Sequence, residues 1–229
     1  MTNITNNLQS VRKRIATAAA ACSRDPAELT LVAVSKKNSA QAVREAWQAG
    51  QRDFAENFLQ EALPKQVELA QLPLTWHFIG RIQSNKTRPI AEHFQWVHTV
   101  DRFKTAQRLS QQRPDDLPPL NLCIQVNVGD RENKAGVEPA EVVELARQIG
   151  SLPRLVLRGL MCMPPESDDT DTQRGYFRIL GELRQILLQH GYQIDTLSMG
   201  MSGDLEAAVA EGATMLRIGT AVFGQRQAT

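Results

Sequence analysis

Short apolar runs alternate along the chain with longer segments in which apolar residues recur every three or four positions. The runs are typical of strands, and the longer segments are typical of amphipathic helices. Several runs are apolar throughout, which predicts parallel strands covered on both faces. The predicted strands are residues 29–34, 53–55, 76–79, 96–99, 120–126, 155–162, 196–199 and 215–218.

The segments between the runs are predicted to be helices. In residues 40–49, Val43, Ala46 and Trp47 share one face, and Gly50 follows as a stop signal. Asp101 is a candidate N-cap for the helix after the fourth strand. Comparable stripes cover residues 142–149 and 177–187. An extra helix over residues 8–18 precedes the first strand, and we expect it to cap the bottom of the fold.

Eight strand–helix units in about 200 residues match a (β/α)₈ TIM barrel of the α/β class. No linker divides residues 1–229, so a single domain is predicted. An open, doubly wound sheet is the alternative, because periodicity does not report closure. The first strand is followed by Ser35-Lys36-Lys37-Asn38-Ser39 rather than by a glycine-rich dinucleotide-binding turn, which favours the barrel.

Composition narrows the function classes. The chain is 42% hydrophobic and 22% charged with a net charge of +1, and its basic residues form no stripe, so no nucleic-acid partner is expected. No apolar run approaches the roughly 18 residues of a membrane span, and the polar first residues do not resemble a signal peptide. We therefore expect a cytoplasmic protein without a membrane partner.

The three cysteines, Cys22, Cys123 and Cys162, are far apart and form no CxxC pattern. Reduced thiols are therefore expected rather than a disulfide framework or a zinc site. A nucleophilic cysteine would need an activating histidine, and the sequence does not identify one. Apart from His77, which lies in a predicted strand, the histidines are His93, His98 and His190. They are scattered along the sequence, so no metal site is predicted.

Lys36 is the first candidate for chemistry, because function in such a barrel collects at the carboxyl ends of strands. Strand alternation makes Lys36 point in the same direction as Val32 and Val34, whereas Lys37 points the other way. Apolar neighbours would lower the pKa of the Lys36 amine, as a Schiff-base lysine requires. A solvated lysine at a strand end is the alternative.

Two glycine-containing loops follow the seventh and eighth strands, where barrel enzymes commonly bind phosphate. The first contains Gly200, Ser202 and Gly203, and the second contains Gly219 and Thr220. Glycine allows backbone N–H groups to approach an anion, hydroxyl groups donate to it, and helix N-termini favour negative charge. These residues otherwise serve turns and caps, but two such loops in the expected places favour a phosphate site.

Other polar residues accompany these loops. Arg217 lies within the last strand, where a buried charge needs either a carboxylate partner or a ligand. His77 lies inside an apolar strand, where a lone histidine is more often a hydrogen-bonded core residue than a catalyst. Asn57 follows a strand and can bond a ligand or close a turn. Lys134 and Gly136 are weak candidates for the edge of the pocket.

Taken together, these residues resemble the pyridoxal phosphate homeostasis protein family. Members of that family are small proteins that bind pyridoxal 5′-phosphate (PLP) in a barrel similar to the N-terminal domain of alanine racemase. Each matching segment alone is weak, whereas their order and spacing from residue 33 to Gly224 are highly specific. The segments are Ala33-Val34-Ser35-Lys36, Glu56-Asn57, His77-Phe78-Ile79-Gly80, Gln83-Ser84-Asn85-Lys86, Arg158-Gly159-Leu160-Met161, Ser198-Met199-Gly200-Met201-Ser202 with Asp204, and Arg217-Ile218-Gly219-Thr220.

The resemblance implies a PLP cofactor held as a Schiff base on Lys36, with Arg217 near the pyridine nitrogen. The other residues that it implies in cofactor binding are Asn57, His77, Ser84, Met201, Ser202, Gly219 and Thr220, with Ser202, Gly219 and Thr220 around the phosphate. One departure is Phe58, where the family usually has tyrosine, so a role for that hydroxyl is in doubt here.

The resemblance also bears on activity. Racemases of this fold take a catalytic tyrosine from a second domain, and the tyrosines of this chain, Tyr176 and Tyr192, lie in no pocket motif. An arginine at the ring nitrogen would also weaken the cofactor as an electron sink. We therefore expect a carrier that buffers PLP and takes part in the homeostasis of vitamin B6 and of amino and keto acids. We expect it to be a monomer or a weak dimer, and PLP-dependent apo-enzymes are its candidate partners. A minor PLP-dependent racemase, or a lyase in which Lys36 attacks a sugar phosphate, are the alternatives.

Overall fold

The computed structural model describes residues 3–129 and 135–224. Within them, eight parallel strands form a closed barrel in chain order, and β8 pairs with β1. The strands are β1 Thr30–Val34, β2 Asp53–Glu56, β3 Thr75–Phe78, β4 Trp96–Val100, β5 Leu120–Gln125, β6 Leu155–Met161, β7 Thr196–Ser198 and β8 Met215–Ile218. Each predicted strand lies within one residue of an observed one at both ends. The TIM barrel prediction is thus confirmed, and the open sheet was wrong.

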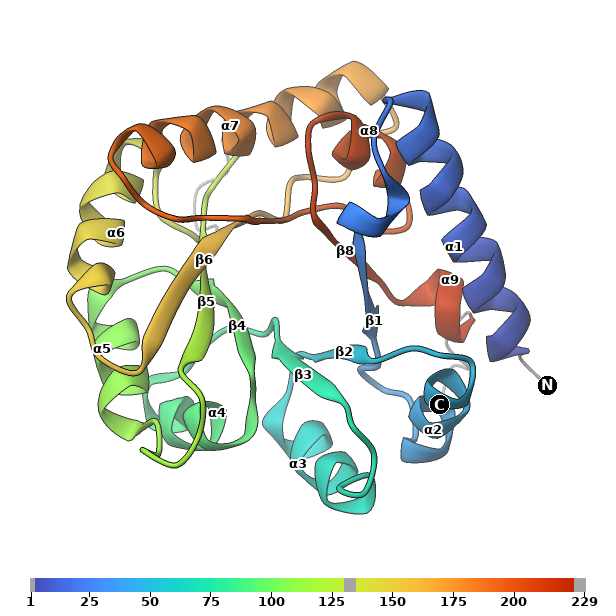
Figure 1. Cartoon of the computed structure of the whole chain (residues 1–229), viewed down its shortest axis with the longest axis horizontal. Coiled ribbons are helices and arrows are strands. Elements are labelled where there is room, and N and C mark those ends of the chain that lie inside the picture. The colour runs from blue at the N-terminus through green and yellow to red at the C-terminus, as the bar shows by residue number, and fades with distance from the viewer. Residues whose placement is uncertain (1–2, 130–134, 225–229) are drawn as a thin grey trace.

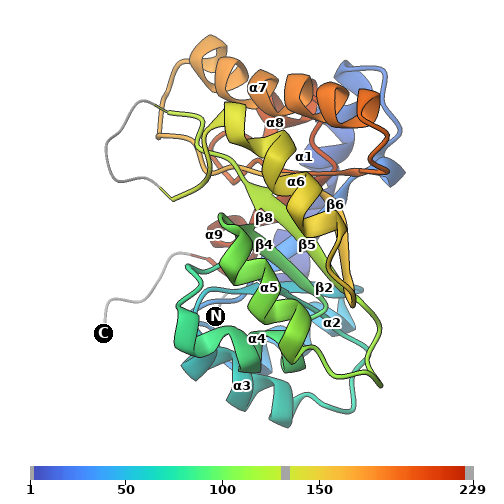
Figure 2. The ribbon, with the colours of Figure 1, turned by 90° about the vertical axis from the view of Figure 1, so that its left-hand side faces the viewer.

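Helices surround the barrel, as Figure 1 shows. They are α1 Ile4–Ala21, α2 Ala40–Gln48, α3 Leu59–Glu68, α4 Thr87–His93, α5 Phe103–Gln112, α6 Val142–Gly150, α7 Thr170–Gln189, α8 Leu205–Ala210 and α9 Thr220–Phe223. In Figure 2, α4, α5 and α6 lie one above the other on the outside of the strands. No helix in the described part of the chain is long and apolar enough to cross a membrane.

The N-terminal helix α1 does not cap the bottom of the barrel, so that expectation was wrong. It packs along α8, α9 and α2 in the outer ring, which Figure 1 shows at the edge of the molecule. Its buried stripe includes Leu8, Val11 and Ile15, and this stripe needs an apolar surface as long as the helix. The neighbouring helices offer such a surface.

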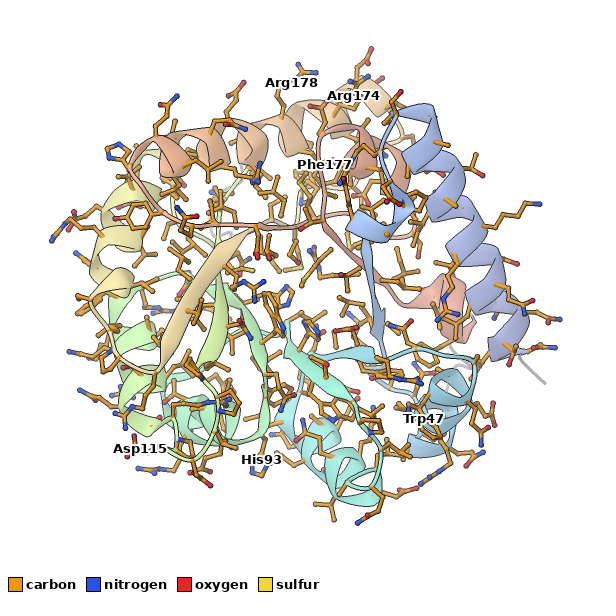
Figure 3. The ribbon with its side chains drawn as sticks, in the orientation of Figure 1. Trp47, His93, Asp115, Arg174, Phe177 and Arg178 are labelled. Atoms are coloured by element: carbon orange, nitrogen blue, oxygen red, sulfur yellow. The ribbon has the colours of Figure 1, made fainter. Side chains whose placement is uncertain are left out.

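The outer helices have one buried face each. Figure 3 shows Phe177 on the inner side of α7, whereas Arg174 and Arg178 lie on its outer side. Val43 and Ala46 of α2 are fully buried, and Gly50 follows the C-cap of that helix with a φ of +87°.

Asp101 does not cap α5, contrary to prediction, because its carboxylate bonds the Arg102 side chain at 2.9 Å instead.

The barrel interior is separated from the layer between strands and helices. A small apolar cluster fills it, made of Val32, Val34, Ala55, Ile79, Trp96, Cys123, Met161 and Met215. Polar side chains share this space, among them His77, His98, Ser198 and Arg217, each at most 3% exposed. A buried polar group is tolerated when it is hydrogen-bonded, so the partners of these residues bear on the site.

Candidate functional site

A cavity of about 1810 Å³ lies at the carboxyl ends of the strands, where β1, β2, β7 and β8 pass into loops. It is larger than the roughly 300–1,000 Å³ of a typical small-molecule pocket. Seven of the residues predicted to bind a cofactor line it: Lys36, Asn57, Met201, Ser202, Arg217, Gly219 and Thr220. Apolar walls come from strand ends, among them Val34 and Ile79, for which sequence analysis predicted no binding role of their own.

Lys36 lies two residues beyond β1 and is half-buried at the cavity wall. The residue before Lys36 is the buried Ser35, and the backbone N–H of Ser35 donates to the Ala55 carbonyl at 2.9 Å. Lys37 borders the same cavity but is exposed, which differs from the prediction that it points away. The chain has already left the strand here, and Lys37 has a φ of +63°, so strand alternation no longer applies.

A buried ion pair supports the backbone on either side of this wall. Lys65 of α3 donates to Glu56 Oε1 at 2.7 Å and to the Ser35 carbonyl at 2.8 Å. The Ser35 hydroxyl donates to the same carboxylate oxygen at 2.6 Å. Burial raises the pKa of Glu56, although Lys65 and Ser35 act in the opposite direction. The pair thereby connects the residue before Lys36 with the residue before Asn57.

Asn57 follows β2 and carries an unsatisfied polar atom. Its side-chain Oδ1 is buried, and no group in the described residues donates to it. Such an atom costs free energy unless a ligand or water bonds it. Because Asn57 also lines the cavity, this acceptor suits a hydrogen-bond donor on a bound molecule.

The two glycine-containing loops lie where sequence analysis placed them. The backbone N–H of Met201 donates to Asp204 Oδ1 at 2.5 Å, which closes the first loop. Arg14 of α1 donates to the Ser202 carbonyl at 2.7 Å and holds the same loop from outside. Gly219 precedes α9, and its carbonyl accepts the first backbone bonds of that helix. Hydroxyl groups and loop N–H groups at one end of a cavity suit a phosphate group.

Arg217 lies on the cavity floor with 3% exposure. Its guanidinium donates to Ser198 Oγ at 2.8 Å and to the Cys162 carbonyl at 2.8 Å. Burial lowers the pKa of Arg217, and no carboxylate bonds this side chain in the described residues. The sequence alternative of a carboxylate partner in the barrel is therefore wrong, since its partners are a hydroxyl and a carbonyl.

Two residues expected at the pocket are not among those that line it. His77 is fully buried inside the barrel and bonds His98 at 2.9 Å, in keeping with the alternative of a hydrogen-bonded core histidine. Ser84 begins a short 3₁₀ turn and is exposed. Phe58 is 49% exposed and does not line the cavity either. Lys134 lies outside the described residues.

His98 is the residue of this region that sequence analysis missed. Its strand runs beside the strand of His77, and both histidines are the third residue of their strands. Their equivalent positions in neighbouring strands were the sequence signal that could have indicated that the two histidines lie close together. Burial raises the pKa of the Cys123 and Cys162 thiols to about 12, which makes these two cysteines poor nucleophiles.

Comparisons with known proteins agree with this geometry. Residues 4–227 match the family model described as alanine racemase, N-terminal domain. The pyridoxal phosphate homeostasis protein of Pseudomonas aeruginosa is 59% identical over 99% of this chain and 97% of its own length. The protein of the same name from Escherichia coli K12 is 50% identical over 99% of this chain and 98% of its own length.

Solved structures extend the likeness. PipY of Synechococcus elongatus without PLP has a TM-score of 0.86 and 41% identity, over 96% of this chain and all of that one. Its structure with PLP bound has a TM-score of 0.83 and 40% identity over the same shares. An alanine racemase of Clostridium difficile has a TM-score of 0.75 at 14% identity, which shows the fold alone, and only 57% of that chain is covered.

A match to the family model over nearly the whole chain agrees with close relatives of similar length and with a barrel of the same shape. The chain belongs to the pyridoxal phosphate homeostasis protein family, whose barrel is that of the alanine racemase N-terminal domain.

Proposed function

We propose that this protein binds pyridoxal 5′-phosphate at the carboxyl ends of its strands and acts as a reversible carrier or buffer of it. The observation that carries the proposal is the meeting of Lys36, Asn57, Arg217 and the two phosphate-suited loops around one cavity. A solved relative at 40% identity has PLP bound, and curated relatives are named for PLP homeostasis. The role extends to intracellular balance of vitamin B6 and of amino and keto acids.

Each part of the cavity suits one part of the molecule. The loops at Met201–Ser202 and Gly219–Thr220 would hold the phosphate, because backbone N–H groups and hydroxyls favour an anion. Arg217 would face the ring nitrogen from the floor, where its pKa, although lowered by burial, leaves it a hydrogen-bond donor. Asn57 Oδ1 would accept from a donor on the ligand or an ordered water.

Lys36 supplies the attachment point. When PLP is bound, its aldehyde carbon would condense with the neutral Lys36 amine and lose its oxygen as water, which gives a carbon–nitrogen double bond that is coloured and reducible by borohydride. Lys36 is half-buried and borders the cavity that would hold the cofactor. A cavity of about 1810 Å³ that admits PLP also leaves room for a second amine, which could displace Lys36 from the cofactor as a carrier requires.

The attachment has a direct test with a matched control. Purified protein is incubated with PLP, its visible spectrum is recorded, and borohydride reduction is followed by peptide mapping. We expect a single pyridoxyl adduct on Lys36, its loss in Lys36→Arg, and its retention in Lys37→Arg. Arginine keeps the charge but does not form the link. An adduct on Lys37 instead would overturn the assignment.

The carrier role needs its own test. Protein loaded with PLP is mixed with a PLP-dependent apo-enzyme, and the regained activity is compared with that from an equal amount of free PLP. We expect transfer to completion at equilibrium. PLP retained on the carrier while the apo-enzyme stays inactive would contradict this role.

We further propose that the protein acts in the cytoplasm, where buried free thiols such as Cys123 and Cys162 stay reduced. We also propose that it is a monomer or a weak dimer, which analytical ultracentrifugation would measure by sedimentation.

A minor amino-acid racemase is the second candidate, favoured by the likeness of the barrel to that of alanine racemase. Against it, no tyrosine of the described residues lines the cavity, and an arginine at the ring nitrogen weakens the electron sink. Incubation with D- or L-amino acids in deuterated water distinguishes the two. We expect no α-proton exchange beyond that caused by free PLP, and faster exchange would favour the enzyme.

A further inference from the structure

A continuous chain of hydrogen bonds runs through the barrel interior. Arg217 Nη1 donates to Ser198 Oγ at 2.8 Å, and that hydroxyl lies 2.7 Å from His98 Nδ1. His98 Nε2 lies 2.9 Å from His77 Nδ1, and His77 Nε2 lies 3.1 Å from Asp53 Oδ1. Every ring nitrogen of the two histidines therefore has a partner.

The chain connects opposite ends of the barrel. Arg217 lies on the cavity floor, whereas Asp53 is the first residue of β2, at the amino ends of the strands. A second hollow at that end is lined by Asp53, and the Asp53 side chain is 28% exposed. The bond between His98 and Ser198 crosses the interior, because β4 and β7 are not neighbours in the barrel.

The Asp53 carboxylate at one end determines the direction of every bond in the chain. A guanidinium only donates and a carboxylate only accepts. A neutral imidazole donates one hydrogen bond and accepts one, and a hydroxyl donates one and can accept two. Ser198 accepts from Arg217 and keeps its own hydroxyl proton, which it can donate to His98 Nδ1. With Asp53 accepting, His77 carries its proton on Nε2, and His98 Nε2–H then donates to His77 Nδ1.

The reverse order is excluded by the carboxylate. If His98 and His77 both carried their protons on Nδ1, the lone pair of His77 Nε2 would face a carboxylate oxygen of Asp53. Neutral imidazoles fit the environment, since burial lowers the pKa of both histidines. Three groups of the interior act on this charge balance. Asp53 favours protonation of His77, whereas His77 and then Arg217 oppose protonation of His98.

We propose that Asp53, His77, His98 and Ser198 are positioning residues that form a one-directional hydrogen-bond chain and orient the Arg217 guanidinium from the far end of the barrel. The inference deepens the proposed function, on which its cofactor readout rests. In that role Ser198 is a pure acceptor toward Arg217, because its own proton is committed to His98. The guanidinium is held by this oxygen and by the Cys162 carbonyl, and its remaining N–H groups are left for a ligand.

The first experiment reads the histidine protons directly in protein without PLP. Long-range proton–nitrogen NMR spectra distinguish Nε2–H from Nδ1–H imidazoles. We expect both His77 and His98 in the Nε2–H form. In Asp53→Asn the amide can donate as well as accept, so we expect a mixture of tautomers at both histidines. Nδ1–H imidazoles in the wild type, or unchanged tautomers in Asp53→Asn, would overturn the chain.

A matched control separates the chain from a general loss of charge at the same end. Asp195 also precedes a strand at the amino end, but its carboxylate binds Arg158 at 2.6 Å and has no bond to the histidines. Asp195→Asn removes one carboxylate there, as Asp53→Asn does. We expect the tautomers of His77 and His98 to be unaffected. A change as large as that of Asp53→Asn would contradict the proposal.

The second experiment measures the effect on the cavity. Ser198→Ala removes one buried hydrogen bond from Arg217, and we expect PLP to dissociate about five- to tenfold more readily and its visible band to shift. Lys36 should still carry the reducible adduct. Affinity and spectrum equal to the wild type would refute the positioning role. If the wild type binds no PLP, the proposed function fails, while the NMR result still decides whether the chain exists.

Discussion

Gly80 shows how a single residue can position the site. It lies two residues beyond β3, and a Cβ atom added to it would come within 1.9 Å of the Asn57 carbonyl oxygen. Backbone of the β2 loop therefore packs directly on Gly80, and no side chain fits between them. This contact holds Asn57 at the cavity, where its side-chain Oδ1 has no hydrogen-bond donor among the described residues.

We expect Gly80→Ala to displace Asn57, to lower the free energy of unfolding by about 1–3 kcal/mol, and to weaken PLP binding. Urea unfolding and PLP titration measure the two effects. Gly175→Ala in α7 is the matched control, because a Cβ there meets nothing within 4 Å. That variant should be as stable as the wild type or more so, since alanine favours a helix. Wild-type PLP affinity in Gly80→Ala would contradict the role of this contact.

The residue scale also shows the reach of sequence reasoning. The family resemblance implied Lys36, Asn57 and Arg217 at the pocket, strand position alone left their roles open, and all three line the cavity. His77 does not line the cavity, because it is fully buried inside the barrel. Ser84 does not line it either, because it lies on an exposed turn, and its predicted role in cofactor binding stays a prediction.

At the scale of elements, α3 is joined to β1 and β2 by one buried lysine. Lys65 is 8% exposed and bonds both Glu56 and the Ser35 carbonyl. Glu56 Oε2 has no partner among the described residues, so Lys65 is the main compensation for this buried carboxylate. Removing one member of a buried pair costs more than the pair contributes, because the other charge stays buried.

We expect Lys65→Met to lower the free energy of unfolding by about 3–5 kcal/mol, less if Glu56 takes up a proton. Urea unfolding at neutral pH measures it, and Lys65→Met with Glu56→Gln should recover part of the loss. Arg88→Ala is the surface control. Its pair with Glu92 on α4 is exposed, and the expected loss is below about 1 kcal/mol. Equal losses in the two single variants would show that burial is not the cause.

Strand boundaries were predictable because they depend on local signals, whereas α1 and α7 extend beyond the stripes predicted over residues 8–18 and 177–187. The strand ends follow from apolar runs, and Gly50, with its φ of +87°, follows the last residue and C-cap of α2, Gln48 and Ala49. The position of α1 was not predictable in the same way. Its apolar stripe requires a partner surface but does not say whether strands or helices provide it, and the structure shows α2, α8 and α9.

At the scale of the whole molecule, the barrel encloses two histidines that folding keeps neutral. Burial lowers the pKa of His77 from its ordinary value of 6.5 and lowers that of His98 further. The unfolded chain therefore binds more protons than the folded one once the pH falls below about 6.5. Stability is lost as the pH falls from there toward the folded-state pKa values.

We expect the free energy of unfolding to fall below pH 6.5 by up to about 1.4 kcal/mol per pH unit for each of the two histidines. Urea unfolding between pH 7.5 and 5.5 measures this slope. A variant with His77→Gln and His98→Gln should be less stable at pH 7.5 but should show a flatter slope. His93→Gln, at an exposed position, should retain the wild-type slope. A wild-type slope that does not exceed that of the double variant would contradict the argument.

The sequence by itself determined the strands, the helices and the strand-end position of Lys36, because hydrophobic periodicity and turn residues act over a few neighbouring positions. Only the tertiary structure decided which distant side chains meet. The bond between His98 and Ser198 joins residues 100 positions apart, and it exists because the closed sheet directs both side chains into one interior. The fold likewise decided that His77 belongs to that interior and that α1 lies in the outer ring. These outcomes depend on strand register and barrel closure, which are properties of the whole chain rather than of any segment.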